Sequence, residues 1–415
     1  MPDILSAHMS TEKILDSRRS PGKLRVLISA GEASGEMYGA ELLEALRKLT
    51  GGAVECFGMG GERMSEAGCK VAVHARDVAV VGLFEVLSHL PGIYREFHKL
   101  LAEVDRLRPD VAVLIDFPDW NFRLAKQLHR RGIPVVYYVS PQLWAWRKGR
   151  LKLVQRYVSK MLVIFPFERE FYAQNGVQAE FVGHPLSKLE LPGVSREDFA
   201  ARWGLDSSRR WVALLPGSRR KELRLNLPAM LGAAERLGPE FEFLMPVAST
   251  LEKEWVREQI ALCAGSVHVK LTDDARASLL HARVGVVASG TATVEAALIG
   301  TPFVMVYRVA GLTWALGRHL VKLPHYGMVN LVAGRRVVPE LIQDAFTPEA
   351  VERQVRALLD GEAREHMTEA LAEVRKLLQG ELATGEQMGS INETTAHRAA
   401  LAVLRVAEIA TADRE

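Results

Sequence analysis

A carboxylate placed directly after an apolar run is the first group in this sequence that could do acid–base chemistry. Asp116 follows residues 111–115, which read VAVLI. A carboxylate held at the end of such a strand can accept a proton from a substrate hydroxyl, and a buried structural hydrogen bond is the alternative role. Asp119 precedes a helical pattern that begins near Asn121, so we predict that it caps that helix. Asp116 is therefore the candidate general base.

Glycines and a hydroxyl follow the first predicted strand. The loop 30–36 contains Gly31, Glu32, Ser34 and Gly35. Backbone N–H groups of such a turn can approach a ligand next to a positive helix end, and a tight turn in which Ser34 caps the helix is the alternative. The carboxylates of Glu32 and Glu36 would repel a phosphate bound at this loop. We therefore predict that the loop binds a sugar hydroxyl or another group of the acceptor substrate.

Two more turns combine glycine and a hydroxyl at the start of a predicted helix, where phosphate oxygens bind well. The first turn holds Gly217, Ser218 and Arg219, and the second holds Ser289, Gly290 and Thr291. Glu295, in the first turn of the helix that follows, can accept hydrogen bonds from both hydroxyls of a ribose. Together these features predict a nucleoside diphosphate. The sequence has no Walker lysine motif and no Asp-x-Asp pair, so we expect Arg219 and helix ends, not a metal, to neutralise the phosphates.

The elements that must position these residues alternate along the chain. Short β-branched runs and longer amphipathic segments follow one another from Leu24 almost to the end, which is typical of βαβ units around parallel sheets. The predicted strands cover 24–29, 54–58, 111–115, 135–139, 161–164 and 180–182, then 211–215, 241–245, 267–271, 284–288 and 302–306. The predicted fold class is α/β, with two doubly wound, Rossmann-like parallel sheets. If the sheets face one another, the candidate loops border a shared cleft, because they follow the carboxyl ends of strands.

Changes in composition divide the chain into segments. Residues 1–22 are charged and lack the apolar h-region of a secretory signal, so we expect a frayed tail. We place the N-terminal Rossmann-like domain at 23–190 and the second at 191–346, because a proline and a glycine interrupt the pattern between them. Residues 347–415 are expected to be helices that begin at a Thr-Pro cap. These helices either return to the first domain or pair with another chain, so a homodimer stays open.

The composition excludes several classes of protein. The chain has 415 residues, of which 48% are hydrophobic and 25% charged, and this is the balance of a packed globular protein. A net charge of +3 and the lack of a recognised motif argue against nucleic acid as a partner. The longest stretch without charged residues is too short and too broken by prolines to span a membrane. Three cysteines without Cys-x-x-Cys spacing indicate neither a disulfide framework nor a zinc site, and we expect a cytoplasmic protein.

Basic residues gather in one stretch without acids, residues 141–160. The candidate surface residues in it are Trp144, Trp146, Arg147, Lys148 and Arg150. Basic side chains interleaved with tryptophan suit an anionic membrane surface, and the apolar segment 78–90 would add to such a surface. A core-facing helix with a solvated basic side is the alternative interpretation.

Eight segments together resemble the lipid-A-disaccharide synthase family. They are SAGEASGE at 29–36, VGLFEV at 81–86, IDFPDWN at 115–121, YVSPQLWAWR at 138–147, GHP at 183–185, LPGSR within 214–219, ASGTATVE at 288–295 and NLVAGR at 330–335. The resemblance runs in order from about residue 24 to residue 340, so it is far more specific than any single loop. Glu36 stands where such loops often have Asp, and residues 1–22 have no counterpart.

The resemblance implies an inverting GT-B glycosyltransferase that uses neither a metal nor a cofactor. Its donor would be UDP-2,3-diacylglucosamine, its acceptor 2,3-diacylglucosamine 1-phosphate, and its products a β-1,6-linked disaccharide phosphate and UDP. The family's catalytic carboxylate falls on Asp116. The UDP-sugar side falls on Gly217, Ser218, Arg219, Ser289, Gly290, Thr291, Glu295 and Asn330.

The same resemblance implies work on acylated sugars at the cytoplasmic face of the inner membrane, as a peripheral protein. It therefore favours residues 141–160 as a membrane-docking surface and places the lipid side in the first domain. Two alternatives stay open. Another GT-B enzyme acting on UDP-N-acetylglucosamine, either a cell-wall transferase or an epimerase, would share the diphosphate turns. A non-catalytic nucleotide-sugar or lipid-binding protein would bind UDP without needing Asp116.

Overall fold

The computed structural model describes residues 23–78, 83–145, 148–263, 265, 267–311, 314, 324–380 and 393–412, with the backbone alone at 83–90, Lys148 and Thr411. The predicted tail at 1–22, Trp146 and Arg147 lie outside the described residues. Within the apolar segment 78–90, residues 79–82 also lie outside them.

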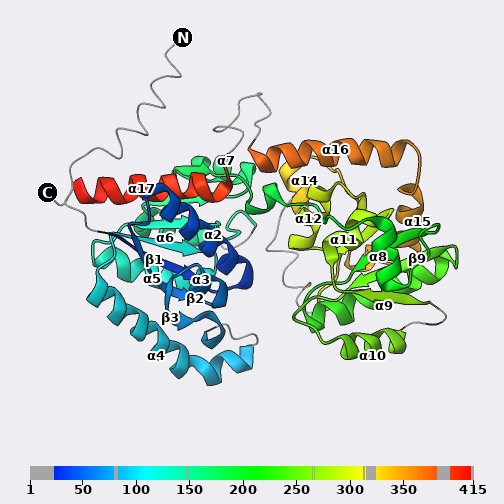
Figure 1. The fold of residues 1–415 in the computed structure, drawn as a ribbon, viewed down its shortest axis with the longest axis horizontal. Helices are drawn as coiled ribbons and strands as arrows, with labels where there is room; N and C mark the ends of the chain where they lie inside the picture. The colour runs from blue at the N-terminus through cyan, green and yellow to red at the C-terminus, as the bar shows by residue number, and fades with distance from the viewer. Residues whose placement is uncertain are drawn as a thin grey trace, which may run out of the picture. The chain divides into compact units, whose positions relative to one another are not determined.

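Seven strands form the first sheet (Figure 1). They are β1 (Leu24–Ala30), β2 (Val54–Gly60), β3 (Lys70–His74), β4 (Val111–Ile115), β5 (Val135–Tyr138), β6 (Lys160–Val163) and β7 (Ala179–Phe181). The strand order is β3-β2-β1-β4-β5-β6-β7, and the pairings among β1 to β5 are parallel. All residues of β4 and β5 are buried, as expected for central strands covered on both faces.

Six strands form the second sheet. They are β8 (Arg210–Leu215), β9 (Phe241–Pro246), β10 (Val269–Thr272), β11 (Val284–Ala288), β12 (Phe303–Tyr307) and β13 (Glu340–Ile342). The order is β10-β9-β8-β11-β12-β13, with every pairing parallel. The predicted class, α/β with two Rossmann-like parallel sheets, is confirmed.

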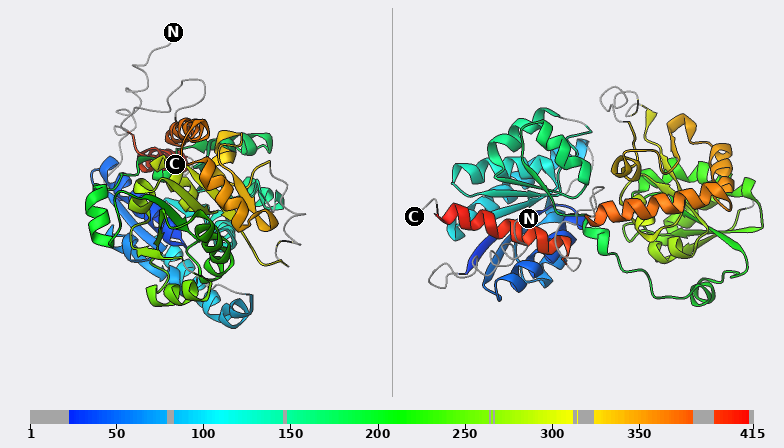
Figure 2. Two further views of the ribbon diagram at one scale, coloured as in Figure 1. Left: turned by 90° about the vertical axis from the view of Figure 1, so that its right-hand side faces the viewer. Right: turned by 90° about the horizontal axis from the view of Figure 1, so that it is seen from above.

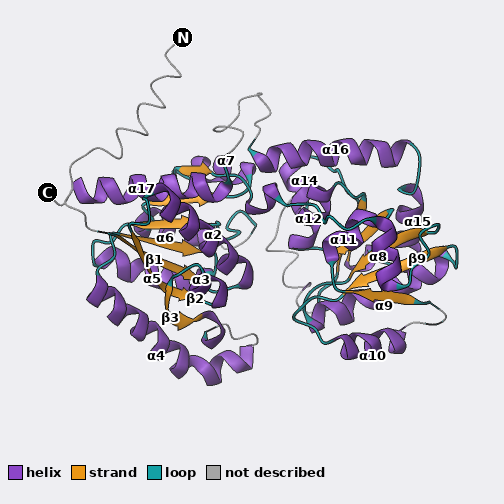
Figure 3. Ribbon diagram, viewed as in Figure 1, coloured by secondary structure: helices purple, strands orange, loops and turns teal. Residues whose placement is uncertain are grey.

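Helices flank the strands in both sheets (Figure 3). Those before residue 190 are α2 (Ala33–Leu49), α3 (Glu62–Glu66), α4 (Leu83–Leu107), α5 (Pro118–Arg130), α6 (Leu151–Tyr157) and α7 (Pro166–Gln174). The later ones are α8 (Arg196–Trp203), α9 (Arg220–Leu237), α10 (Lys253–Cys263), α11 (Ala275–His281), α12 (Thr291–Ile299), α14 (Met328–Ala333), α15 (Pro348–Ala357), α16 (Glu362–Gln379) and α17 (Thr395–Ala412). Short 3₁₀ helices lie at Ala75–Asp77, Lys148–Arg150, Pro185–Lys188 and Gln343–Ala345.

The chain divides into two compact units. One consists of residues 1–141, 156–161 and 396–415, and the other of residues 142–155 and 162–395. The first unit contains β1 to β5 and almost all of α17, which runs beside the blue and cyan elements in Figure 2. The second unit contains the whole second sheet. The proposed domain limits at 190 and 346 stay predictions.

Local signals explain where several helices begin. The Ser195 hydroxyl accepts a hydrogen bond from the Asp198 N–H, and the Thr347 hydroxyl accepts one from the Ala350 N–H, with Pro348 at the first helical position. The start of α15 at its Thr-Pro cap was predicted. Strands β3 and β13 were not, because β3 has only one buried residue and β13 has three residues.

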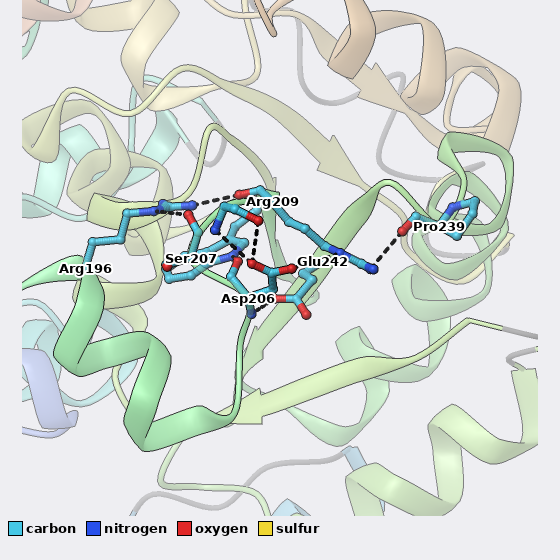
Figure 4. A network of polar contacts seen from close by, with 8 residues as sticks. Arg196, Asp206, Ser207, Arg209, Pro239 and Glu242 are labelled. Carbon is cyan, nitrogen blue, oxygen red and sulfur yellow. Dashed lines mark hydrogen bonds and ion pairs between the residues drawn. The ribbon is translucent and has the colours of Figure 1, made fainter.

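Arg196 fixes the amino end of β8 in the second unit (Figure 4). Its guanidinium lies 3.6 Å from the centre of the Trp211 ring and donates to the carbonyl oxygens of Ser207 at 3.3 Å and Arg209 at 2.8 Å. Burial lowers the pKa of this guanidinium. The contacts anchor the strand whose carboxyl end carries a candidate phosphate turn.

Candidate functional site

Both sheets reverse their strand order at one point, and the candidate loops lie at these two points. In the first sheet the order turns between β1 and β4, and in the second between β8 and β11. Ligands of open α/β sheets bind outside the carboxyl ends of the strands at such switch points. Ala30 is in register with Ile115, so Gly31 and Asp116 continue from neighbouring strand ends. Ile115 is in turn in register with Tyr138 of β5.

The backbone at this edge of the first sheet is strained. Asp116 has φ +44° and Phe117 has φ +45°, and Val139, at the end of β5, has φ +62°. Left-handed backbone is uncommon for residues other than glycine and is an outlier for a β-branched residue such as valine. Such strain gathers at functional sites, where the surroundings hold it in place. Val139 was predicted to be the last residue of its strand, and its left-handed turn ends β5 one residue earlier.

A buried amide holds the Asp116 turn. The Asn121 Nδ2 donates to the carbonyl oxygens of Asp116 at 2.7 Å and Ile115 at 3.1 Å, and its Oδ1 accepts from the Ser29 hydroxyl at 2.8 Å. The Tyr137 hydroxyl donates to the same Asp116 carbonyl oxygen at 2.6 Å. Asn121 is fully buried. These contacts tie the ends of β1, β4 and β5 together and support the left-handed backbone at Asp116.

Gly31 is required by the ring of Phe117. A Cβ atom at residue 31 would lie 2.3 Å from two ring carbons of Phe117, which no side chain can do without displacing the ring. At Gly35 a Cβ atom would meet Ile115 at an ordinary 3.4 Å. Of the predicted acceptor-side residues, Gly31 and Gly35 are buried, Ser34 is half-buried and Glu32 is exposed.

The environment of Asp116 suits proton transfer. Burial, and then the negative charge of Glu32, raises the pKa of Asp116 to about 7, while a hydrogen bond from the Phe117 N–H opposes the shift. A carboxylate with a pKa near the working pH is a good general base, because much of it is ionised at that pH and the ionised form has a high affinity for a proton. Perturbed pKa values of this kind mark candidate functional sites.

The cap predicted at Asp119 is wrong, and the alternative role of Ser34 as a helix cap does not apply either. Helix α5 begins at Pro118 with Phe117 as its N-cap, so Asp119 lies inside the first turn. Helix α2 begins at Ala33 with Glu32 as its N-cap, so Ser34 does not cap it either. Both helices start earlier than their apolar patterns: Glu32 has the extended backbone usual for an N-cap, whereas Phe117 is left-handed, and neither side chain makes a capping hydrogen bond.

The two predicted phosphate turns begin at the same level of the second sheet. Leu215 is in register with Val287, so the turn at Gly217 and the turn at Ser289 follow neighbouring strand ends. Gly217 has φ +119° and leads into α9, whose N-cap is Arg219. The Ser218 N–H donates to Glu222 Oε2 at 3.2 Å and the Arg219 guanidinium to Glu222 Oε1 at 3.3 Å.

The second turn opens α12. Gly290 has φ +148° and is the N-cap, and Thr291 starts the helix. Ser289 donates its N–H to the Val306 carbonyl oxygen at 2.9 Å, which sets the turn against β12. The predicted ribose carboxylate, Glu295, lies one turn into the helix and accepts from the Arg276 Nε at 3.0 Å. The structure therefore brings seven of the eight predicted donor-side residues to one edge of one sheet.

Asn330 is the exception. Its side chain is fully buried and its amide is engaged within the protein. The Nδ2 donates to the Val338 carbonyl oxygen at 2.9 Å and to Glu340 Oε1 at 2.8 Å, and the Oδ1 accepts from the N–H groups of Val337 and Val338. In this conformation Asn330 supports the chain around β13, and its contact with a nucleotide stays a prediction.

The predicted membrane residues divide into three groups. Trp144 is buried, donates from Nε1 to Glu168 Oε1 at 3.2 Å and packs edge-on against Phe167. Its assignment to the surface is therefore wrong. The basic stretch around Trp144 does not predict its buried partner, because Glu168 lies outside that stretch. Arg150 is half-buried, and only the backbone of Lys148 is described. Trp146 and Arg147 lie outside the described residues.

Four residues that organise the sites were not predicted from the sequence: Asn121, Tyr137, Glu222 and Arg276. Each acts on a candidate residue that lies elsewhere in the chain or on the backbone, so motif spacing alone carries little signal for it. Asn121 had one usable signal, an amide in the first turn of the helix that follows Asp116. Cys56 and Cys69 are also neighbours, with sulfur atoms 2.7 Å apart in buried positions.

Two kinds of feature are absent from the described residues of the chain. Within that part of the chain, no group of three or more His, Cys, Asp or Glu side chains is arranged to hold a metal ion. Among the described helices, none combines the length and the apolar character that crossing a membrane requires.

Comparison with known proteins gives one consistent family. The family model described as Lipid-A-disaccharide synthetase matches residues 26–390. A lipid-A-disaccharide synthase of Koribacter versatilis (strain Ellin345) is 60% identical over 386 residues, which cover 93% of this chain and 99% of that protein. One of Acidobacterium capsulatum is 52% identical over 395 residues, covering 92% and 98%.

Solved structures show the same fold at low identity. UDP-GlcNAc 2-epimerase from Neisseria meningitidis, bound to UDP-GlcNAc, has a TM-score of 0.59 and 13% identity, with 86% of this chain and 97% of that chain covered. MurG of Acinetobacter baumannii has a TM-score of 0.52 and 14% identity, with 85% and 95% covered. At these identities the likeness supports the fold alone, the GT-B arrangement of two Rossmann-like sheets.

Proposed function

The chain belongs to the lipid-A-disaccharide synthase family and is a glycosyltransferase of lipid A biosynthesis, and we propose that its donor is UDP-2,3-diacylglucosamine. The acceptor is 2,3-diacylglucosamine 1-phosphate, and the products are a β-1,6-linked disaccharide 1-phosphate and UDP. The observation that carries this proposal is Asp116, a carboxylate with a pKa near 7 held in a strained turn at the switch point of the first sheet.

Asp116 is the proposed general base. Its carboxylate takes the proton of the acceptor's 6-hydroxyl while that oxygen attacks the anomeric carbon of the donor sugar. The bond from the anomeric carbon to the diphosphate oxygen breaks on the opposite face, so the configuration inverts through an oxocarbenium-like state. The proton remains on Asp116 until solvent removes it. The loop with Gly31, Glu32, Ser34 and Gly35 is the proposed acceptor side, because it lies beside Asp116 at the same strand ends.

The second sheet supplies the proposed nucleotide site. Arg219, the Ser218 N–H and the N-terminus of α12 at Gly290 and Thr291 stabilise the negative charge that grows on the leaving diphosphate. Glu295 accepts hydrogen bonds from the ribose hydroxyls. Ser289 and Gly217 shape the two turns, and Asn330 supports the chain around β13.

Turnover of defined substrates tests the proposal. Purified protein is incubated with the UDP-diacylglucosamine and the monosaccharide phosphate, and UDP release and the mass of the tetraacyl disaccharide are followed with chelator present. Asp116→Ala and Arg219→Ala are expected to lose about a hundredfold or more in rate with native circular dichroism. Near-normal turnover in either variant would remove that residue from the mechanism. Absence of product with the wild-type protein would overturn the substrate assignment.

We also propose that the protein works as a peripheral protein at the cytoplasmic face of the inner membrane. Both proposed substrates carry acyl chains that must partly leave a bilayer. Helix α6 packs its apolar residues Leu151 and Val154 inside the protein, so the support from this helix is limited to its exposed basic side, where Lys152 and Arg156 are available to anionic headgroups. Flotation with vesicles containing phosphatidylglycerol tests it at low salt. The wild type should float, and a Lys152→Glu, Arg156→Glu variant should float less; failure of the wild type to float would refute the proposal.

A further inference from the structure

The Glu222 carboxylate already occupies the groups that the proposed function assigns to a diphosphate. We propose that Glu222 is an internal competitor for these groups, which the diphosphate of the nucleotide displaces when it binds. Glu222 thereby sets the affinity for the donor and for the UDP product. This inference rests on the proposed nucleotide site and deepens it.

The contacts of Glu222 use both of its oxygens. Oε2 accepts from the Ser218 N–H at 3.2 Å, and Oε1 accepts from the Arg219 guanidinium at 3.3 Å. The carboxylate also lies against Gly217, where a Cβ atom would come within 2.7 Å of Oε2. A carboxylate is thus placed on one backbone donor and one cationic donor, which is the donor pair that a phosphate takes at a helix N-terminus.

The negative charge of Glu222 also acts on Tyr307, the last residue of β12. Burial and then Glu222 raise the pKa of the Tyr307 hydroxyl at the end of β12, and Arg219 opposes the shift. Arg219 and Glu222 together therefore present little net positive charge in this conformation. A diphosphate that approached the turn would be repelled by Glu222 while Arg219 remained engaged.

The neighbouring turn lacks this arrangement. Helix α12 has no acidic residue in its first turn, and among the described residues, apart from Gly290 and its chain neighbours, no atom lies within 4 Å of where a Cβ of this N-cap would stand. Of the two predicted phosphate turns, one is therefore open and the other is neutralised by its own helix. Displacement of Glu222 is feasible, because its side chain is 36% exposed and can turn into water.

A purely structural role for Glu222 leads to the opposite result. A carboxylate in the first turn that accepts from an N–H just before the helix also stabilises helix starts. If that were its only role, removal of the charge would loosen the turn and weaken nucleotide binding. If Glu222 competes with the diphosphate, removal of the charge strengthens binding, because the donors of Ser218 and Arg219 become available.

Calorimetric titration of the full chain with UDP distinguishes the two roles. Glu222→Gln is expected to bind UDP roughly threefold to tenfold more tightly than the wild type and to be inhibited more strongly by UDP as product. Uridine, which has no phosphates, should bind both proteins equally. Glu252→Gln is the matched control, because Glu252 pairs with Arg220 at 3.3 Å beside the same helix start; its UDP affinity should equal that of the wild type.

Each other outcome is decisive. Equal or weaker UDP binding by Glu222→Gln, with wild-type uridine binding, would overturn the inference and leave the proposed function intact. A wild type that binds no UDP would overturn the proposed nucleotide site itself. If Glu222→Gln fails to fold, Glu222→Ala replaces it: it removes the charge and both oxygens that occupy the Ser218 and Arg219 donors, so UDP should bind more tightly in the same sense, and unchanged binding would refute the inference.

Discussion

The side-chain amide of Asn121 donates a hydrogen bond to the backbone carbonyl oxygen of Asp116 at 2.7 Å. Because both φ angles at Asp116 and Phe117 are positive, this turn needs support from outside its own backbone. Asn121→Ala removes two donors to the strand end and leaves buried carbonyl oxygens without them. We expect turnover to fall by about tenfold to a hundredfold and the free energy of unfolding to fall by roughly 1–3 kcal/mol, while UDP affinity stays unchanged.

Ser29→Ala is the control for Asn121. The Ser29 hydroxyl donates to Asn121 Oδ1 at 2.8 Å, so its removal leaves both Nδ2 contacts with the Asp116 turn in place. The initial rate of UDP release should then fall much less than in Asn121→Ala. Equal losses in the two variants would show that general loosening of the buried network, and not the Asp116 carbonyl contact, controls the rate.

The pH dependence of activity should follow Asp116. A general base must be ionised, so kcat/KM should rise with pH through about 7 and level off above it. Glu32→Gln removes the neighbouring negative charge, which is the second cause of the raised pKa after burial. The rising limb should therefore move to lower pH in this variant. A limb that stays in place would mean that Glu32 does not act on the titrating group.

The same raised pKa predicts a pH-dependent effect on stability. The folded state holds the Asp116 proton more tightly than the unfolded chain, whose pKa is near 3.8, so this group lowers the free energy of unfolding as pH rises from about 4 to about 7. Asp116→Asn cannot ionise and should melt at a higher temperature than the wild type at pH 8. The gain at pH 8, about 1.4 kcal/mol per unit of pKa shift at most, should shrink towards pH 4. A pH-independent difference would contradict the raised pKa.

Two glycines in one loop should respond differently to the same change. Gly31→Ala puts a Cβ atom into the Phe117 ring and should displace the Asp116 turn, with a loss of roughly 1–3 kcal/mol in stability and most of the activity. In Gly35→Ala the new Cβ atom would make only ordinary contacts, and alanine favours the helix α2 in which it lies. This variant should therefore keep its stability and activity. Thermal melting and turnover of the pair check this, and equal damage at both positions would rule out the Phe117 ring as the cause.

Arg276 should affect nucleotide binding through Glu295. Its guanidinium holds Glu295 Oε1 at 3.0 Å, which fixes the carboxylate proposed to bind the ribose. Arg276→Ala should weaken UDP binding several-fold, whereas binding of 2′,3′-dideoxy-UDP, which has no ribose hydroxyls to offer, should be the same in wild type and variant. An equal loss for both nucleotides would assign Arg276 to general support of the helix.

The periodicity of the sequence determined the two parallel sheets and the loops that matter. Buried strands such as β4 are continuous apolar runs, and the residues after them are visible as Asp116 or as Gly-Ser-Arg without any coordinates. Strands with few buried residues, such as β3, carried no such signal. Helix starts at Ser195 and Thr347 were readable because the capping contact is local in sequence.

The tertiary structure decided which groups reach each other across those loops. The Ser29 hydroxyl donates to Asn121, and the buried Trp144 donates to Glu168. The Asn330 amide makes its hydrogen bonds within its own unit. These partners are separated along the chain, and a hydrogen bond between distant residues depends on strand register and helix placement, which sequence spacing does not encode. The sequence by itself therefore determined the fold class and the identity of the candidate base. Only the folded chain set the pKa of that base, because burial and the distance to Glu32 exist only once the strands have packed.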